Sequence, residues 1–287
     1  MDVAVLGMGR MGSALAIRLL HGGHRVAVWN RSKGKAGEVV SAGAREAQSV
    51  ADAVRDADVV ITMLANDEAV RAVALGDLRS SIGDQAIYVN CSTVSPALNS
   101  ELAHAFAARF LAMPVLGGPA AVRAGQAAYL PGGEGSVADR LAPVLSSLSA
   151  TIHRYDTASL ATTAKLAVNL LLLSQITALA ESFAVGRSGG LSDDQLRELL
   201  GGSVMVAPGI QNRFEDILTG AQDGWWTTML GAKDASLAIN VARGAHVELP
   251  EAEAVKRLYD KAAASGLDHA DVAAVTELYR RPATALP

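Results

Sequence analysis

Three closely spaced glycines near the start of the chain constrain its fold more than any other feature. Gly7, Gly9 and Gly12 stand between an apolar run at residues 3–6 and an amphipathic stretch, and a second apolar run follows at Arg25–Trp29. This order predicts a strand, a tight turn, a helix and a second strand. Glycines in such a turn allow a sharp bend and a close approach of the backbone to a ligand.

The alternation of apolar runs and helical stretches continues to residue 157. Further strands are predicted at Asp58–Leu64, Ala86–Asn90 and Phe110–Val115, with helices at Asp67–Ala74 and after Ser95-Pro96. Strands separated by helices indicate a parallel sheet with helices on both faces. We therefore predict an α/β fold for residues 1–157, a Rossmann-type, doubly wound and mostly parallel sheet.

The pattern changes near Thr157, after which no convincing strand is found. Leu160–Arg187 is predicted to form one long helix that ends before Gly189-Gly190. Shorter helical segments are predicted at Ser192–Leu200 with Ser192 as N-cap, Ile210–Leu218, Lys233–Arg243 and Glu251–Ser265, with a final turn or two in Asp268–Arg280. Residues 158–287 are therefore predicted to be an all-α domain.

Composition excludes several classes of partner. A chain of 287 residues suits two domains. A net charge of −4 without a basic run gives no footprint for nucleic acid or an anionic membrane.

Cys91 is the single cysteine, no Cys/His cluster has zinc spacing, and the N-terminus lacks a signal-peptide pattern. The apolar region Leu166–Ala180 falls short of the ~20 residues of a membrane span. We expect a cytoplasmic protein with a small-molecule substrate.

The glycine turn matches the spacing G-x-G-x-x-G in a strand–turn–helix context. That context places a pyrophosphate at the N-terminus of the helix. The residues assigned to this cofactor site are Gly7, Gly9, Arg10, Met11 and Gly12, joined by Leu64 and Ala65 at the end of a later strand. The alternative is a glycine-rich turn that holds no ligand.

The residues after the second strand favour one cofactor. A site for NAD usually carries an acidic residue there, but this chain has Asn30-Arg31-Ser32. A guanidinium can pair with a 2′-phosphate, and Asn and Ser can donate further hydrogen bonds. We therefore predict NADP, with Arg31 as a solvated surface side chain as the alternative.

Two polar residues interrupt the long apolar helix. Lys165 and Asn169 are four residues apart, so they share one helix face. A lysine there either extends to the surface or lies in a cleft where desolvation lowers its pKa enough for proton transfer. The spacing does not decide between these interpretations.

Five blocks of residues together resemble one family. They are Gly7–Gly12, Asn90-Cys91-Ser92-Thr93, Pro114–Pro119 with Gly125, Lys165–Asn169 and Lys233-Asp234. Their order and approximate separation resemble the β-hydroxyacid dehydrogenase family, which includes 3-hydroxyisobutyrate dehydrogenases and glyoxylate/succinic semialdehyde reductases. The resemblance covers nearly the whole chain. It implies an NAD(P)-dependent oxidoreductase acting on a CH–OH group, a C-terminal domain like that of 6-phosphogluconate dehydrogenase, and a homodimer or higher homo-oligomer. It also implies that residues 158–287 are the substrate and dimerisation domain, with the long helix between the two domains.

The resemblance also implies roles for particular residues. Lys165 would be the general acid/base, and Asn169 would orient the substrate. Ser92 and Thr93 would lie between the nicotinamide and the substrate, and Lys233 would reach over the cofactor. The backbone N–H groups of Gly117 and Gly118 would bind a substrate carboxylate.

The chain departs from the family motif at Leu116. The family usually has Asp-x-Pro-Val-Ser-Gly-Gly, so the apolar Leu116 replaces a serine that would bind a carboxylate. A lost hydrogen bond to a charged group costs roughly 1.5–3 kcal/mol, unless backbone amides suffice.

This departure keeps two alternative functions open. Imine reductases share the fold, the glycine loop and often an Asn-Arg-Ser/Thr, but usually lack the lysine of the long helix. The chain has Lys165, so NADPH-dependent reduction of a small aldehyde or ketone comes first and imine reduction second. A third alternative is a non-catalytic dinucleotide-binding module, which has no need of Lys165, Asn169 and Lys233.

Overall fold

A computed structural model describes residues 1–220 and 223–280. The chain divides into two compact units, Met1–Lys165 and Leu166–Pro287. Helix α10 (Ala158–Ser188) contributes to both. The boundary expected at residue 157 immediately precedes α10, whereas the division by contacts falls inside this helix. Residues 281–287, which belong to the predicted second domain, lie outside the described part of the chain.

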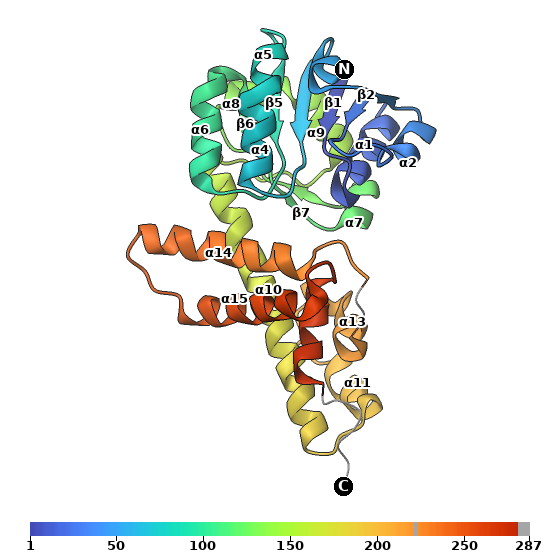
Figure 1. Cartoon of the computed structure of the whole chain (residues 1–287), viewed down its shortest axis with the longest axis vertical. Coiled ribbons are helices and arrows are strands. Elements are labelled where there is room, and N and C mark those ends of the chain that lie inside the picture. The colour runs from blue at the N-terminus through green and yellow to red at the C-terminus, as the bar shows by residue number, and fades with distance from the viewer. Residues whose placement is uncertain (221–222, 281–287) are drawn as a thin grey trace. The chain divides into compact units, whose positions relative to one another are not determined.

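The first unit contains a six-stranded sheet (Figure 1). Its strands are β1 (Asp2–Leu6), β2 (Arg25–Trp29), β3 (Arg45–Glu46), β4 (Val59–Thr62), β5 (Ile87–Asn90) and β6 (Phe110–Ala112). The spatial order is β3-β2-β1-β4-β5-β6, and every neighbouring pair is parallel. This is the strand order of a Rossmann fold, so the predicted fold is confirmed.

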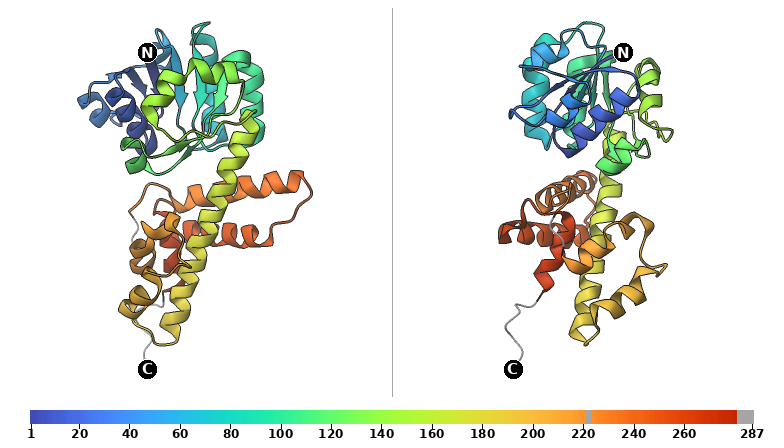
Figure 2. Two further views of the ribbon diagram at one scale, coloured as in Figure 1. Left: turned by 180° about the vertical axis from the view of Figure 1, so that it is seen from behind. Right: turned by 90° about the vertical axis from the view of Figure 1, so that its right-hand side faces the viewer.

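Helices cover both faces of this sheet (Figure 2). They are α1 (Arg10–His21), α2 (Gly37–Ser41), α3 (Val50–Val54), α4 (Asp67–Val73), η1 (Ala74–Leu78), α5 (Arg79–Ser81), α6 (Pro96–Phe106), η2 (Ala107–Arg109), α7 (Pro119–Arg123), α8 (Gly135–Arg140) and α9 (Ala142–Leu148). The amphipathic stretch after the glycine turn forms α1, as predicted.

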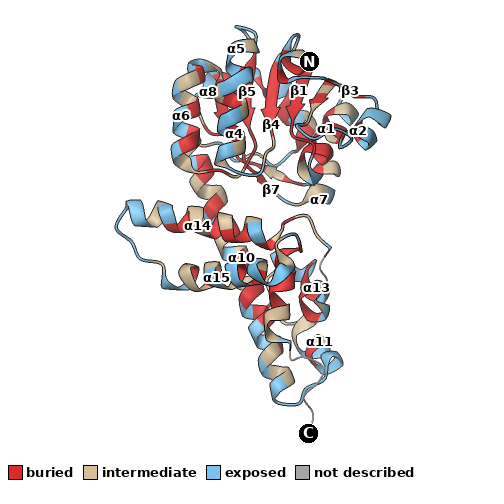
Figure 3. Ribbon diagram, viewed as in Figure 1, coloured by how far each residue is buried: buried red, intermediate tan, exposed pale blue. Residues whose placement is uncertain are grey.

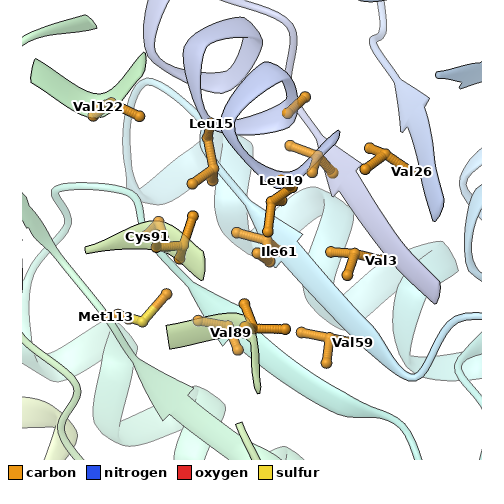
Figure 4. Close-up of a cluster of buried hydrophobic side chains, with 14 of the residues drawn as sticks. Val3, Leu15, Leu19, Val26, Val59, Ile61, Val89, Cys91, Met113 and Val122 are labelled. Atoms are coloured by element: carbon orange, nitrogen blue, oxygen red, sulfur yellow. The ribbon is translucent and has the colours of Figure 1, made fainter. Parts of the chain in front are cut away.

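Alternating side chains of the strands enter two separate cores. Val3 and Val5 of β1 pack in a cluster with Leu15 and Leu19 of α1, whereas the intervening Ala4 belongs to the cluster on the opposite face. Figure 4 shows the first of these clusters. A strand buried on both faces appears in the sequence as a continuous apolar run, which explains why these runs were visible, and Figure 3 shows the central strands as buried.

The register brings the carboxyl ends of five strands into one row. Leu6 pairs with both Trp29 and Thr62, Thr62 pairs with Asn90, and Asn90 pairs with Ala112. The loops that follow these strands therefore leave the sheet at the same edge. Ligands of open α/β sheets bind at this edge, where the strand order reverses, here between β1 and β4.

The expected strand Phe110–Val115 is wrong in extent. The parallel strand β6 stops at Ala112, and Val115 belongs to β7 (Val115–Leu116), which pairs antiparallel with β8 (Ala128–Tyr129). Pro114 lies between the two strands and has no backbone N–H to continue a ladder. The two-residue strand β3 is exposed and has no apolar pattern, so the sequence did not reveal it.

The second unit is helical. It contains most of α10, α11 (Asp193–Gly201), α12 (Pro208–Gln211), α13 (Phe214–Thr219), α14 (Thr228–Gly244), α15 (Pro250–Ala262), η3 (Ala263–Leu267) and η4 (Val272–Tyr279). Leu173, Ile176 and Phe183 of α10 contribute to its core. Its described residues form no strand, and their strand-like pairing is limited to one isolated bridge between Thr227 and Asp271.

Capping residues account for the helix boundaries. Ser192 caps α11 through a capping box with Gln195, as expected. The helix predicted to begin at Lys233 begins five residues earlier, because the hydroxyl of Thr227 accepts a hydrogen bond from the N–H of Leu230. The segment predicted as one helix at Ile210–Leu218 is two short helices, α12 and α13.

Helix α10 passes a length and composition test for a membrane span. Its 31 residues include an 18-residue window with a mean hydropathy of 1.5, of which 39% is buried. The apolar segment is therefore longer than Leu166–Ala180, the stretch expected from the sequence. A core helix passes the same test, and α10 carries part of the core of the second unit.

Candidate active site

The glycine loop is closed by backbone contacts that exclude side chains. The N–H of Gly7 donates to the carbonyl oxygen of Trp29 at 2.8 Å, and Gly7 has a φ of +111°. A Cβ added at Gly7 would lie 2.3 Å from the Met63 carbonyl oxygen, and one at Gly12 would lie 1.8 Å from the Gly7 carbonyl oxygen. At Gly9 no atom lies within 4 Å of such a Cβ. Two glycines therefore close the turn, and Gly9 borders open space.

Helix α1 begins at this open space. Gly9 is its N-cap, no side chain caps it, and no acidic residue lies in its first turn. The first N–H groups of a helix have no partner within the helix, and together with the helix dipole they favour an anion. Arg10 is exposed and Met11 is half-buried at this end. The geometry fits a diphosphate held by backbone N–H groups.

Asn30 ties the glycine loop to the end of β2. Its side-chain oxygen accepts a hydrogen bond from the N–H of Met8 at 3.0 Å, and its amide nitrogen donates to the carbonyl oxygen of Ser32 at 2.8 Å. Asn30 therefore stabilises the loop, and because its amide nitrogen carries two hydrogens, the hydrogen bond from Asn30 to a phosphate stays a prediction. Arg31 and Ser32 are exposed next to it.

Ser92 joins the loops after β4 and β5. Its hydroxyl accepts a hydrogen bond from the N–H of Leu64 at 2.9 Å and lies 3.4 Å from the carbonyl oxygen of Thr62. The side chain is buried, with 1% of the residue exposed. Thr93 and Leu64 are half-buried, and Ala65 is exposed. Ser92 thus holds two neighbouring loops together.

The expected carboxylate site lies in the turn after β7. Gly117 has a φ of +133°, a conformation that side chains disfavour, and the residue is exposed. Gly118 and Leu116 are half-buried beside it. The leucine thus occupies an intermediate position between the core and the solvent.

A second polar group forms between α10 and α14. The amide nitrogen of Asn169 donates to Oδ2 of Asp234 at 2.8 Å, and Nζ of Lys233 lies 3.0 Å from Oδ1 of Asp234. Asn169 is 5% exposed and Asp234 is 2% exposed. Lys165 is half-buried one turn before Asn169 on α10. The structure therefore brings Asn169 and Lys233 together through one carboxylate.

Asp234 is the residue to which sequence reasoning assigned no role. It was visible as part of the block Lys233-Asp234, and the signal that could have found it is an acidic residue on the apolar face of a helix. Asp234 orients the Asn169 amide because that amide is its direct hydrogen-bond partner.

Most of the candidate residues fall into two groups, one in each unit, while Asn30 supports the glycine loop and Gly117 and Gly118 lie in the turn after β7. Those along the carboxyl edge of the sheet are Gly7, Gly9, Arg10, Met11, Gly12, Arg31, Ser32, Leu64, Ala65, Ser92 and Thr93. The second unit holds Asn169, Lys233 and Asp234, and Lys165 is the last residue of the first unit.

The fold and the glycine loop together define a dinucleotide-binding α/β protein with a helical second unit. Residues 2–156 match the NAD binding domain of 6-phosphogluconate dehydrogenase. Residues 160–279 match the family described as NAD-binding of NADP-dependent 3-hydroxyisobutyrate dehydrogenase. The chain belongs to the β-hydroxyacid dehydrogenase family of oxidoreductases.

Relatives agree over nearly their whole length. An uncharacterized oxidoreductase of Bacillus subtilis, YfjR, is 32% identical over 96% of this chain and 98% of its own. The 3-hydroxyisobutyrate dehydrogenase of Pseudomonas aeruginosa is 30% identical over 97% and 98%. The 3-hydroxyisobutyrate dehydrogenase of Mycobacterium tuberculosis, solved with L-serine, is 27% identical with a TM-score of 0.84, over 98% and 99%.

Imine-reducing enzymes share the fold. A reductive aminase from Aspergillus terreus, solved with NADPH, cyclohexanone and allyl amine, has a TM-score of 0.63 over 97% of this chain and 99% of its own. Its sequence is 22% identical.

Proposed function

We propose that this chain is an NADPH-dependent reductase of a small aldehyde or ketone, with Lys165 as the general acid. The observation that carries the proposal is the open, uncapped N-terminus of α1 at Gly9, built on a turn in which Gly7 and Gly12 leave no room for a Cβ. NADPH bound there would supply the hydride, and the protein supplies orientation and the proton.

The preference for the phosphorylated cofactor rests on Arg31. It is exposed directly after β2, where an acidic residue would repel a 2′-phosphate. Asn30 holds this loop against the glycine turn, so Arg31 and Ser32 are presented close to the cofactor edge. Arg31→Asp is expected to raise the Kd for NADPH by about 10–100-fold through loss of a charged hydrogen bond, with little change for NADH. Equal effects on both cofactors would show that Arg31 does not read the phosphate.

The second unit contributes orientation. Asp234 fixes the amide of Asn169, which leaves the amide oxygen of Asn169 to accept a hydrogen bond from a substrate hydroxyl or from the ammonium of Lys165. Lys165 lies one turn earlier on the same helix. In this arrangement Lys165 would donate a proton to the substrate oxygen in reduction and would accept it in oxidation.

The substrate is proposed to be a small carbonyl compound. The apolar Leu116 reduces the number of donors for a carboxylate beside Gly117. The buried, internally bonded hydroxyl of Ser92 cannot replace the missing serine, so we reassign Ser92 from substrate contact to loop support. Semialdehydes and glyoxylate-like acids are the first compounds to test. We expect substrates that carry a carboxylate to bind more weakly than neutral analogues.

Imine reduction is the second candidate. The shared fold of the reductive aminase and the apolar Leu116 favour it. A protein that reduces imines would turn over cyclic imines with NADPH faster than it turns over aldehydes, and substrate-panel kinetics at one pH would separate the two. Tight NADPH binding without turnover of any compound would instead support a binding module.

Replacement of Lys165 tests the proposal. Lys165→Ala is expected to lower kcat by about 10²–10⁴-fold with an unchanged Kd for NADPH. Lys256→Ala is the matched control, because this lysine lies on α15 in an exposed pair with Asp260. An unchanged kcat in Lys165→Ala would contradict the proposed role of Lys165. An equal loss of kcat in Lys256→Ala would show that the loss does not depend on which lysine is removed.

A further inference from the structure

A chain of buried polar side chains crosses the first unit. The hydroxyl groups of Tyr88 and Thr62 lie 3.0 Å apart, and Thr62 donates to the side-chain oxygen of Asn90 at 2.9 Å. The amide nitrogen of Asn90 donates to the side-chain oxygen of Asn99 at 2.8 Å, and that of Asn99 donates to the hydroxyl of Thr162 at 2.7 Å. Each of these residues is at most 1% exposed.

The hydrogen bonds of this series of side chains all run in one direction, from Tyr88 to Thr162. Thr62 donates its only hydroxyl hydrogen to Asn90, so the hydroxyl of Tyr88 must donate to Thr62. At the other end, Thr162 donates its proton to the carbonyl oxygen of Ala158 in the first turn of α10. Hydrogen bonds aligned in this way strengthen one another in a low-dielectric interior.

Two members of this hydrogen-bonded series, Asn90 and Thr162, lie next to candidate site residues. Asn90 also accepts a hydrogen bond from the N–H of Ser92 at 3.1 Å, so it holds the loop that continues to Thr93. Thr162 precedes Lys165 by three residues on α10, so the two side chains lie on adjacent parts of one face. Asn99 of α6 is the direct bridge between Asn90 and Thr162.

A buried polar bridge specifies a position more sharply than an apolar contact. An apolar contact survives a small rotation of a helix, whereas a hydrogen bond at 2.7 Å weakens steeply as its angle changes. A misplaced bridge also leaves buried polar groups without partners. The bridge through Asn99 therefore fixes the rotation of the first turns of α10 against the sheet.

We propose that Asn99 is a positioning residue that sets Lys165 against the loop of Ser92 and Thr93. This inference rests on the proposed role of Lys165 as the general acid. Asn99 acts through Thr162, and neither residue touches substrate or cofactor in this account.

The hydroxyl of Thr162 provides the cleanest test. Thr162→Val removes the hydroxyl with little change in shape, and displacement of a proton donor by a fraction of an ångström is expected to lower kcat by about 10-fold. The KM and the Kd for NADPH are expected to stay within about twofold of wild type, because neither Thr162 nor Asn99 lies in the binding loops. Thr162→Ser keeps the hydroxyl and is expected to restore kcat.

A second threonine on the same helix gives the matched control. Thr177 is 5% exposed, and its hydroxyl donates to the carbonyl oxygen of Ser174 at 2.9 Å. Thr177→Val therefore removes a buried hydroxyl from the same helix and is expected to leave kcat unchanged. An equal loss of kcat in Thr162→Val and Thr177→Val would overturn the proposal.

A double-mutant cycle separates positioning from general damage. If Asn99 and Thr162 act through Lys165, Thr162→Val is expected to change kcat by less than about twofold in a Lys165→Ala background. Asn99→Ala, where it folds, is expected to show the same pattern. Persistence of the 10-fold loss in that background would overturn the positioning role, with the role of Lys165 intact. An unchanged kcat in Lys165→Ala alone would instead overturn the proposed function and this inference with it.

Discussion

The glycine loop and the Asn169–Asp234–Lys233 cluster position their groups in two different ways. The loop is made by backbone groups within a few residues, and what matters is the absence of side chains at Gly7 and Gly12. The cluster is made by side chains, and its hydrogen bond joins positions 65 residues apart in the sequence. Adding a side-chain atom to the loop should therefore impair cofactor binding, and removing a side-chain atom from the cluster should impair turnover.

The largest effect is expected in the core of the second unit. Nε of Arg213 lies 3.1 Å from Oδ1 of Asp271, and these side chains are 6% and 4% exposed. Asp271→Ala leaves a buried guanidinium without its partner, which costs roughly 3–5 kcal/mol. Urea unfolding measures this change, and Asp194→Ala, which breaks an exposed pair with Arg197, is the control. Comparable losses in both variants would show that burial does not set the cost.

A methyl group added to the loop gives the next largest effect. The Cβ of Gly12→Ala would overlap the Gly7 carbonyl oxygen, and forced displacement in a tightly packed site costs about 1–3 kcal/mol or more. We expect NADPH binding to weaken by about 10–100-fold in fluorescence titrations. Gly9→Ala should fold with an unchanged Tm because its Cβ meets open space, and a drop in Tm there would contradict the geometry.

Removal of one carboxylate should affect the cluster without affecting the loop. Asp234→Ala removes the acceptor of the Asn169 amide and one partner of Lys233. We expect kcat to fall by about 10–100-fold, in the range of a lost orienting hydrogen bond, with the Kd for NADPH within about twofold of wild type. Steady-state kinetics and a binding titration on the same preparation test this separation.

The smallest expected effect concerns pH. A hydrogen bond from Arg187 holds the pKa of Asp193 below its ordinary value of 3.8. The folded state therefore binds this proton more weakly than the unfolded state, so the stabilisation is complete above pH 3.8 and is lost as the pH falls below it. The side chains of Arg187 and Asp193 are 25% and 48% exposed, so Asp193→Asn should change the free energy of unfolding at pH 7 by less than about 1 kcal/mol. A larger change would mean that the pair is shielded from solvent.

The elements that sequence reasoning predicted well depend on local patterns. The apolar runs of β1, β4 and β5 are visible because these strands are buried or nearly buried, and that of β2 is visible although only Val26 and Val28 are buried. The turn at Gly7–Gly12 is visible because its steric requirements fall within six residues. The start of α14 was misplaced because Thr227 caps it through a weak local signal.

The contacts that sequence reasoning missed connect distant positions. The bridge from Asn99 to Thr162 spans 63 residues, and no spacing rule connects the two. The contact of Asn30 with the N–H of Met8 was missed because a side chain after a strand can turn either outward or back to the chain, and no local pattern indicates which. The assignment of Asn30 to the cofactor stays a prediction. The homo-oligomer and the cytoplasmic location stay predictions, and sedimentation analysis of the purified protein tests the former.

Calorimetric titration of the full chain with NADPH and with NADH tests the central claim most directly. The account predicts one site per chain, with NADPH bound more tightly than NADH by about 10-fold or more because a guanidinium at Arg31 pairs with the additional phosphate. Binding of neither cofactor to the folded protein, or equal affinity for both, would contradict it.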